Sequence, residues 1–295
     1  MDAALAKEEA LKRDLAGLGR ALVAFSAGVD STYLLDVGHA VLGARIEAVT
    51  ADSPSLARSS LDEARAFCAA RGIAHRVVAT DEFEVEAYRA NDGQRCFHCK
   101  SALMKAMSGL ALATADGRAG AALLIGAIAD DFADVRPGLQ AAAAAGARWP
   151  LADAGMTKDE VRARSRARGL PTWDRPAEPC LSSRIPYGEP VTPEAVRMVE
   201  AAEACLRYLG LSHCRARHHR VGAKADGGAR GWLCRIEVPD ADLERVLAAR
   251  AELLPALRRI GYANVALDLA GLVSGGYNGL LSAGERADAV LPVRA

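Results

Sequence analysis

Short apolar runs alternate with amphipathic helical patterns through the first half of the chain. Helical spacing of apolar residues begins at about Thr32 and recurs across 60–72. The apolar runs cover residues 21–25, 45–50, 74–79 and 121–127. Strands that alternate with helices in this way are typical of parallel sheets built from crossover units. We therefore predict an α/β fold with a doubly wound parallel sheet, in which ligands bind beyond the carboxyl ends of the strands.

A proline-rich stretch separates this half from the rest of the chain. Residues 176–193 read PAEPCLSSRIPYGEPVTP, which holds too many prolines for a regular element. We therefore place a first domain at 1–178 and a second at 179–295. The pattern of the second domain predicts a small α+β fold. Its expected elements are a helix from 193 to about 209, strands at 214–220, 231–238 and 262–270, and a helix over 240–257.

The first helix of this second domain carries a carboxylate on its apolar stripe. Thr192 and Pro193 suit the cap and the first turn of the helix. Helical spacing then puts Glu203 on the same stripe as Val196 and Val199. A carboxylate on a buried face needs a partner.

The two strands that follow concentrate charge on one face. Period-two alternation puts Arg215, Arg217 and His219 on one side of the first strand, and Arg235 with Glu237 on one side of the second. Such a face is either a solvent-exposed surface of mixed charge or a site for an anion such as phosphate, which arginine suits well.

The residues between the first apolar run and the next helix form a candidate anion-binding loop. Residues 25–31 read FSAGVDS, a turn of small, hydroxyl and acidic side chains. Backbone N–H groups at a helix N-terminus bind phosphate, and the hydroxyls of Ser26 and Ser31 add donors. Asp30 would repel phosphate unless Mg²⁺ lies between them, which favours a magnesium–nucleotide complex. The alternative is an ordinary strand-to-helix turn, because the same residues are common helix caps.

Composition and charge exclude some classes of function. The chain has 295 residues, 51% of them hydrophobic, which suffices for a substantial core. Its 37 basic and 37 acidic residues cancel, so no overall field favours nucleic acid or a membrane surface. The start of the chain is charged and helix-patterned rather than a signal peptide, and no window approaches the ~20 apolar residues of a membrane span. We expect a cytoplasmic protein without nucleic-acid or membrane partners.

Three of the seven cysteines lie in settings that indicate chemistry. Cys96 and Cys99 form a C-x-x-C pair within RCFHCK, and Cys180 lies in the proline-rich stretch near Arg184. A loop cysteine near a cation is more reactive than a buried one. The pair alone is compatible with a metal site, a disulfide or a redox couple. We expect the other four cysteines to fill the core: Cys68, Cys205, Cys214 and Cys234.

Longer stretches of the sequence resemble a known enzyme family. SAGVDS is similar to the S-G-G-x-D-S loop of the PP-loop ATP pyrophosphatases, with Ala27 in the place of a glycine. Almost the whole chain then resembles the LarE-type ATP-dependent sulfur transferases. Ala127 and Ile128 depart from the threonine and asparagine that are more usual there. The stretches that carry the resemblance are EAVTADSP, RCFHCK, DDFADVRPG, PLADAGMTKDEVR, CLSSRIPYG, CRARHH, RIEV and LDLAGLVSGGYN.

The resemblance implies a reaction in the biosynthesis of the nickel-pincer nucleotide cofactor. LarE-type enzymes cleave ATP to AMP and pyrophosphate while they adenylate a carboxylate of pyridinium-3,5-biscarboxylic acid mononucleotide, which they convert to a thiocarboxylate. The resemblance also implies a functional link to the carboxylase and nickel-insertion enzymes of the same pathway. It further implies a homo-oligomer, such as a hexamer.

The resemblance also implies roles for individual residues. Those that would bind ATP and Mg²⁺ are Ser26, Gly28, Val29, Asp30, Ser31, Asp131 and Arg136, with Asp130 and Asp134 as further polar groups of the same loop. Those that would bind the nucleotide substrate are Ser183, Arg184, Glu203, Arg215, Arg217 and Glu237. The catalytic set would be Cys180, Arg184 and Asp30.

Two sources of sulfur are compatible with the resemblance. In one, Cys96, Cys99 and Cys180 hold a 4Fe–4S cluster, and the iron without a protein ligand binds a transferable sulfide. In the other, Cys180 gives up its own sulfur and becomes dehydroalanine. A structural zinc site lacks a suitable fourth ligand, because His98 lies inside the C-x-x-C itself.

Two other functions stay open from the sequence. A tRNA thiolase of the same superfamily would share the ATP loop, but it would need a basic surface to hold tRNA. A non-enzymatic module that binds a nucleotide or a metal would leave RCFHCK with a structural role.

Overall fold

The computed structural model describes residues 3–112, 120–133, 136–223 and 229–273, together with 277 and 279. The described chain divides into two compact units. The first contains residues up to Glu82 and Gln94–Glu178, and the second contains Phe83–Gly93 and the residues from Pro179 onward. A short segment from the first half of the sequence therefore belongs to the second unit.

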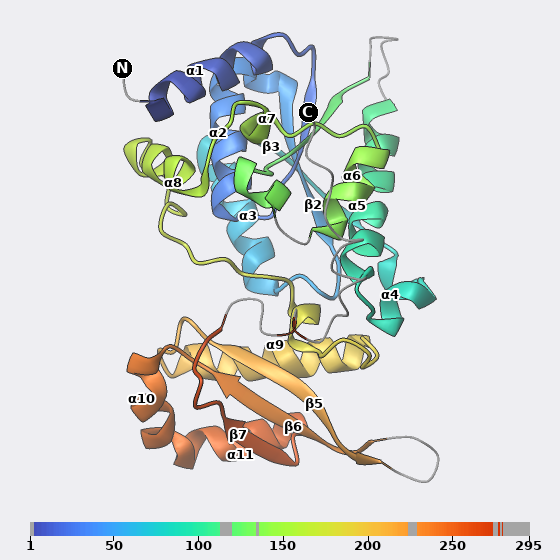
Figure 1. The fold of residues 1–295 in the computed structure, drawn as a ribbon, viewed down its shortest axis with the longest axis vertical. Coiled ribbons are helices and arrows are strands. Elements are labelled where there is room, and N and C mark those ends of the chain that lie inside the picture. Colours follow the sequence, from blue (N-terminus) through green and yellow to red (C-terminus); the bar gives the residue numbers. More distant parts are fainter. Residues whose placement is uncertain are drawn as a thin grey trace. The chain divides into compact units, whose positions relative to one another are not determined.

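A four-stranded parallel sheet forms the centre of the first unit (Figure 1). Its strand order is β3-β2-β1-β4, and every neighbouring pair is parallel. The strands are β1 (Ala21–Ala24), β2 (Ile46–Asp52), β3 (Ala74–Ala79) and β4 (Ala122–Ile125). Each overlaps one of the four apolar runs, so the predicted α/β class with a parallel sheet is confirmed.

Helices cover both faces of this sheet, which explains why its central strand is apolar throughout. All four residues of β1 are buried, because alternate side chains enter different cores. Val23 packs with residues of α1 (Ala3–Ala16), α2 (Val29–Leu42), α3 (Arg58–Arg71) and α8 (Lys158–Ala167). Leu22 and Ala24 pack with residues of α5 (Arg95–Leu112) and α6 (Pro137–Ala144).

The second unit is built on a three-stranded mixed sheet in the order β5-β6-β7. β5 (Arg215–Ala223) and β6 (Ala229–Glu237) are antiparallel, and β7 (Asn264–Leu267) is parallel to β6. Residues of α9 (Pro193–Tyr208), α10 (Leu243–Ala248) and α11 (Arg250–Ile260) share one apolar core with these strands. The charged face of the sheet lies opposite this core, because Ala216 and Ile236 alternate with the arginines.

The helices of the second unit differ in part from the expected ones. Thr192 caps α9 by accepting a hydrogen bond from the Ala195 N–H at 3.1 Å, and Pro193 is the first helical residue, as predicted. The single helix expected over 240–257 is wrong. The chain turns at Ala249, whose φ of −81° and ψ of 2° lie in the bridge region, and this turn divides α10 from α11.

Short helical segments connect the main elements. They are η1 (Gly43–Arg45), η2 (Glu82–Glu84), α4 (Glu86–Ala90), η3 (Ala129–Ala133), α7 (Pro150–Asp153), η4 (Leu181–Arg184) and η5 (Asp240–Asp242). In the described part of the chain, no helix combines the length and the hydrophobicity needed to cross a membrane.

Candidate functional site

The loop between β1 and α2 forms one hydrogen-bonded turn. The Ser26 N–H donates to Ser31 Oγ at 3.3 Å, and Ser31 Oγ donates to the Gly28 carbonyl at 3.3 Å. The two serine hydroxyl oxygens lie 3.1 Å apart. Val29 and Asp30 open α2 directly after Gly28. The structure thus gathers the predicted ATP-loop residues at the N-terminus of a helix, where phosphate is favoured.

Ala27 takes a left-handed conformation at the start of this turn. Its φ is 56°, and its side chain is 2% exposed. The Arg175 guanidinium donates to the Ala27 carbonyl at 3.0 Å. A residue that usually is glycine in the related loop therefore keeps a glycine-like conformation here, despite its methyl group.

Gly126, at the end of β4, packs directly against the same loop. A Cβ atom at this position would lie 2.8 Å from the Ser31 nitrogen and 2.9 Å from its Cα. These distances are shorter than real contacts, so only glycine lets β4 approach the loop this closely. Sequence reasoning missed Gly126; the available signal was a glycine directly after an apolar run.

Lys158 is a second residue that sequence reasoning missed. Its Nζ donates to both carboxylate oxygens of Asp30, at 2.7 and 3.0 Å. Its N–H, in the first turn of α8, donates to Asp130 at 2.7 Å. Burial raises the pKa of Asp30, and this outweighs Lys158, which lowers it. The Lys158 cation therefore offsets part of the cost of burying this carboxylate.

Specific contacts also stabilise the acidic loop after β4. Asp131 accepts a hydrogen bond from the Ile128 N–H at 3.1 Å and pairs with Arg136 at 2.9 Å. Ile128 is 3% exposed and its side chain belongs to the apolar core. Its contribution to this loop is therefore the backbone N–H group that donates to Asp131. Asp134 lies outside the described residues.

Cys96 and Cys99 lie in the first turn of α5. Cys96 is exposed and Cys99 is half-buried, and residues three apart lie on the same side of a helix. Gly138 of α6 comes close to this turn, since a Cβ there would lie 3.4 Å from the Cys96 carbonyl oxygen. None of the seven cysteines forms a disulfide. Within the described ranges, no group of three or more histidine, cysteine or acidic side chains is arranged to hold a metal ion.

Cys180 belongs to the second unit, where hydrogen bonds from Arg184 stabilise the loop that contains Cys180. Cys180 is half-buried and directly precedes η4. Arg184 is 3% exposed and donates to the Pro179 carbonyl at 2.7 Å and to Ser183 Oγ at 2.9 Å. Its Nε donates to Glu203 at 2.7 Å. Glu203 is thus buried on the α9 stripe as predicted, and Arg184 is its partner.

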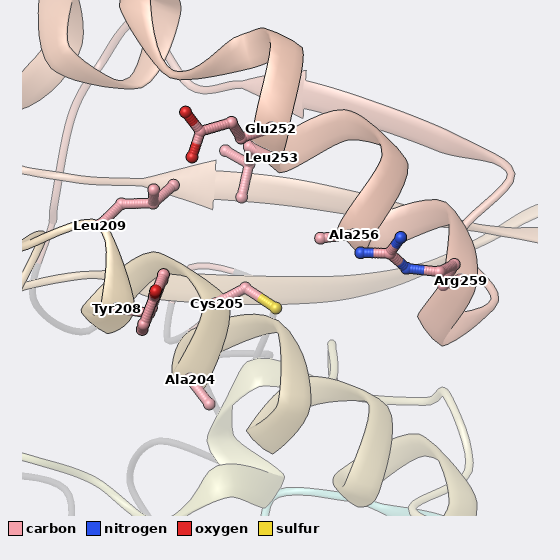
Figure 2. Close-up of a pocket in the computed structure, with 8 residues that line it drawn as sticks. All are labelled: Ala204, Cys205, Tyr208, Leu209, Glu252, Leu253, Ala256 and Arg259. Atoms are coloured by element: carbon pink, nitrogen blue, oxygen red, sulfur yellow. The ribbon is translucent and has the colours of Figure 1, made fainter.

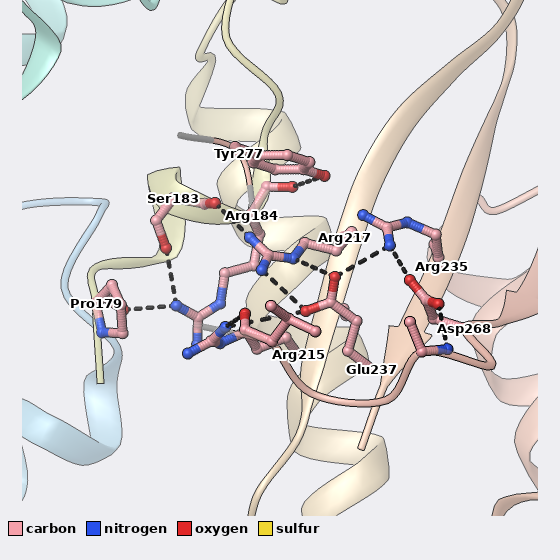
Figure 3. Close-up of polar contacts among 12 residues, drawn as sticks. Pro179, Ser183, Arg184, Arg215, Arg217, Arg235, Glu237, Asp268 and Tyr277 are labelled. Carbon is pink, nitrogen blue, oxygen red and sulfur yellow. Dashed lines mark hydrogen bonds and ion pairs between the residues drawn. The ribbon is translucent and has the colours of Figure 1, made fainter. Parts of the chain in front are cut away.

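The charged face of the second sheet is a buried cluster (Figure 3). Arg217 donates twice to Glu237, at 2.9 Å each, and once to the Ser183 carbonyl at 2.9 Å. Arg215 donates to the Val273 carbonyl at 2.6 Å and lies 4.0 Å from Glu237. The arginines are 7% and 4% exposed and Glu237 is 3% exposed, so the solvent-exposed alternative is wrong. Burial, together with Arg217 and Arg184, lowers the pKa of Arg215.

Tyr277 covers this cluster, and sequence reasoning missed it. The Arg217 guanidinium carbon lies 4.5 Å from the centre of its ring, which is a cation–π contact. The Tyr277 hydroxyl lies 3.2 Å from His219 Nε2. Arg235, on the neighbouring strand, pairs with Glu237 at 3.1 Å and also with Asp268. The cluster therefore holds a surplus of arginines over carboxylates in the described residues, a setting that suits an anion.

Comparison with known proteins gives the family. No protein-family model matches the chain. It is 41% identical to an uncharacterized protein of Synechocystis sp. over 278 residues, 94% of this chain and 98% of the relative. It is 32% identical to pyridinium-3,5-bisthiocarboxylic acid mononucleotide synthase of Lactiplantibacillus plantarum over 282 residues, 95% of this chain and 97% of the relative. The chain belongs to the LarE-type family.

The remaining cysteines of this LarE-type protein are Cys68, Cys205, Cys214 and Cys234. Cys68, Cys214 and Cys234 are buried, as predicted. Burial raises the pKa of Cys68 to about 11 and that of Cys234 to about 12, which makes both poor nucleophiles. Cys205 agrees with the prediction in part: it packs against the core of the second unit but is only half-buried, and it lines an open groove of about 440 Å³ between α9 and α11 (Figure 2).

Proposed function

We propose that this LarE-type protein is an ATP-dependent sulfur transferase that acts on pyridinium-3,5-biscarboxylic acid mononucleotide. The observation that carries the proposal is the 32% identity, over 95% of the chain, to a pyridinium-3,5-bisthiocarboxylic acid mononucleotide synthase. The geometry is compatible with it, because one unit holds a phosphate-type loop and the other holds a cysteine beside a buried arginine cluster.

In this proposal, ATP binds at the turn of residues 26–31. The N–H groups at the start of α2 and the serine hydroxyls donate to the phosphates. Asp30 offers the oxygen ligands that Mg²⁺ prefers, and its present partner is the ammonium group of Lys158. Bound Mg²⁺ would supply charge neutralisation for the phosphates. Lys158, Asp131 and Arg136 are the charged groups that this chain itself places around the loop.

The chemistry then proceeds in two steps. A substrate carboxylate oxygen attacks the α-phosphorus, the bond between that phosphorus and the bridging oxygen breaks, and pyrophosphate leaves. Sulfur next attacks the acyl carbon, and AMP leaves with the former carboxylate oxygen. Adenylation makes the second step feasible because AMP is a far better leaving group than oxide.

We propose that the arginine cluster binds the phosphate of the nucleotide substrate. Arg215 is the main candidate, since it contacts the Val273 carbonyl and lies as far as 4.0 Å from the Glu237 carboxylate. Arg184 and Arg217 already bind Glu203 and Glu237, and both donate to backbone of the Cys180 loop. We propose that they hold the loop in place in addition to contacting the substrate.

For the sulfur source, we propose Cys96, Cys99 and Cys180 as ligands of a 4Fe–4S cluster that would supply sulfide. Two thiols about one helical turn apart, the exposed Cys96 and the half-buried Cys99, fit such a ligand set. The alternative is that the Cys180 thiolate, which is half-buried, attacks the acyl carbon and displaces AMP to form a thioester. Loss of the Cys180 α-proton to solvent then breaks the Cβ–S bond, which leaves the thiocarboxylate and dehydroalanine.

Anaerobic purification tests the source of sulfur. We expect a brown protein that contains iron and acid-labile sulfide and that releases AMP when given ATP and the biscarboxylated nucleotide. Colourless protein with stoichiometric zinc would contradict the cluster.

A substitution tests the role of Cys180. The variant Cys180→Ala should lose thiocarboxylate formation and keep its KM for ATP, because the hydrogen-bonded turn of residues 26–31 does not involve Cys180. The matched control is Cys205→Ala, which removes another half-buried thiol of the second unit. If Cys180→Ala still forms product, the assignment of Cys180 is wrong.

A further inference from the structure

A segment that precedes the C-x-x-C helix binds the loop that carries Cys180. Asn91 is fully buried and left-handed, with a φ of 58°. Its side-chain amide donates to the Pro186 carbonyl at 2.7 Å and to the Glu189 carbonyl at 2.8 Å. Its own carbonyl accepts from the Gly188 N–H at 3.0 Å. One asparagine thus satisfies several backbone groups of residues 186–189.

Tyr88 makes a second attachment closer to Cys180. Its hydroxyl lies 2.8 Å from Ser182 Oγ, and both side chains are buried, at 1% and 0% exposed. The Phe83 ring packs on the Tyr88 ring, with 5.0 Å between their centres. The Val191 N–H also donates to the Arg89 carbonyl at 2.9 Å. Residues 83–93 and 180–191 therefore form one hydrogen-bonded body within the second unit.

The loop needs these contacts because it lacks regular structure of its own. Apart from η4, no helix or strand covers residues 180–191, and Pro186 and Pro190 offer no N–H group. Buried carbonyls in such a loop need donors from elsewhere. Arg184 donates to the Pro179 carbonyl at the end of the loop that contains Cys180, and Asn91 donates to the Pro186 carbonyl nearer the other end.

We propose that Tyr88 and Asn91 are positioning residues for Cys180. They hold residues 181–189 in one conformation and so fix where the Cys180 thiol points. In the sequence, this segment is followed by α5, which carries Cys96 and Cys99. Only the expected change in the rate of thiocarboxylate formation rests on the proposed sulfur transfer. The conformational part stands on the contacts alone.

The sharpest variant is Asn91→Gly. Glycine accepts the left-handed backbone without strain, so the substitution removes the whole buried side chain, with its amide donors and acceptor, and keeps the φ of residue 91. Tyr88→Phe removes only the hydroxyl. Tyr262→Phe is the matched control, because Tyr262 is equally buried, at 1%, and its hydroxyl contacts His218 in the same unit, away from the Cys180 loop.

The conformational readout is hydrogen exchange followed by mass spectrometry. In Asn91→Gly and Tyr88→Phe, we expect exchange of residues 181–191 to accelerate by about tenfold, as fits the loss of one or two buried hydrogen bonds. Strands β5 and β6 should exchange at the wild-type rate. Alkylation of Cys180 in metal-free protein should accelerate in parallel, with Cys205 as the internal reference.

The functional readout compares the single-turnover rate of thiocarboxylate formation with the KM for ATP. We expect the single-turnover rate of thiocarboxylate formation to fall by about tenfold or more, because misplaced reacting groups lower the rate steeply. The KM for ATP should stay unchanged in both variants. A smaller amount of folded protein would lower the amplitude of the single turnover and leave both its rate constant and the KM for ATP unchanged.

The outcomes separate the inference from the proposed function. If residues 181–191 exchange in the variants as in Tyr262→Phe, the inference is wrong whatever the activity. If their exchange accelerates but Cys180 alkylation and the single-turnover rate do not change, Tyr88 and Asn91 are structural only, and the inference is also overturned. If wild-type protein forms no thiocarboxylate, the proposed function fails, and the exchange and alkylation data still decide whether the segment holds the loop.

Discussion

Ala27 holds a backbone conformation that residues with a side chain rarely adopt. A left-handed φ of 56° costs a non-glycine residue about 1–2 kcal/mol, whereas glycine loses about 0.5–1 kcal/mol more entropy on folding than alanine. We therefore expect Ala27→Gly to raise the free energy of unfolding by about 0.5–1 kcal/mol, measured by urea denaturation.

Ala64 offers the matched control for this substitution. It lies inside α3, is 0% exposed and belongs to the same apolar core as Ala27, so glycine relieves no strain there and should lower the free energy of unfolding by about 1 kcal/mol. If Ala27→Gly destabilises the protein as much as Ala64→Gly does, the backbone at Ala27 is not strained.

We expect a substitution of Gly126 to change activity more than it changes the free energy of unfolding. A Cβ there would approach the Ser31 backbone to 2.8 Å, so alanine must push the loop away from β4. Because a shift of about 1 Å in a binding loop can cost ~10²-fold in rate, we expect Gly126→Ala to lower kcat/KM for AMP release about 100-fold.

Gly109 is the control for Gly126. It lies on the exposed side of α5, with no atom within 4 Å of an added Cβ. Gly109→Ala should leave AMP release unchanged and stabilise the helix by about 1 kcal/mol. Equal activity of the two variants would show that the loop tolerates displacement.

At the scale of elements, Glu8 joins three helices of the first unit. This α1 side chain is 1% exposed and accepts hydrogen bonds from Tyr33 of α2 at 2.8 Å and from Arg164 of α8 at 2.6 Å. Removal of one partner from a buried ion pair is strongly destabilising. We expect Glu8→Gln to lower the free energy of unfolding by about 3 kcal/mol at pH 7.

Glu9 is the matched control, because it also pairs with Lys12 but its side chain is 51% exposed. Glu9→Gln should change the free energy of unfolding by less than about 1 kcal/mol, as is usual for exposed pairs. Similar losses in the two variants would contradict the structural role of Glu8.

The same carboxylate predicts a pH dependence. Burial alone would raise the pKa of Glu8, but hydrogen bonds from Arg164, Lys12 and Tyr33 lower it to about 2, from an ordinary value of 4.5. The folded state therefore resists protonation that the unfolded state accepts. The stabilisation is complete above pH 4.5 and is lost as pH falls toward 2. The difference in unfolding free energy between wild type and Glu8→Gln should shrink across this window, and a constant difference would contradict the assignment.

Local patterns predicted the elements well and their contacts poorly. Period-two alternation correctly put Arg215 and Arg217 on one face, and helical spacing correctly buried Glu203. These features depend on neighbours a few residues away. The Lys158–Asp30 pair joins residues 128 positions apart, so no local pattern encodes it. The place of Asn91 in the second unit likewise depends on a loop that lies about a hundred residues later.

At the scale of the whole molecule, positive and negative charges are equal in number, and several arginines form buried ion pairs. The 37 basic and 37 acidic residues give a net charge of zero and a pI of about 7.0. Several arginines that look basic in the sequence are buried against carboxylates, as Arg184 is against Glu203 and Arg217 against Glu237. The arginine-rich stretches of the second unit therefore favour a small anion held inside a cluster over a polyanion held on a surface.

This charge balance separates the proposed function from that of a tRNA thiolase. Binding of a polyanion needs many exposed cations and weakens steeply as salt rises, because counterions are released from each neutralised phosphate. We expect filter binding to retain no tRNA above background at about 0.15 M salt, where exposed charges are screened beyond ~8 Å. AMP release should depend on the biscarboxylated nucleotide and should not respond to tRNA. Retention of tRNA that falls steeply between about 50 and 200 mM salt, together with tRNA-stimulated AMP release, would favour the thiolase instead. A known tRNA-binding protein, assayed in parallel, shows that the filter detects such complexes.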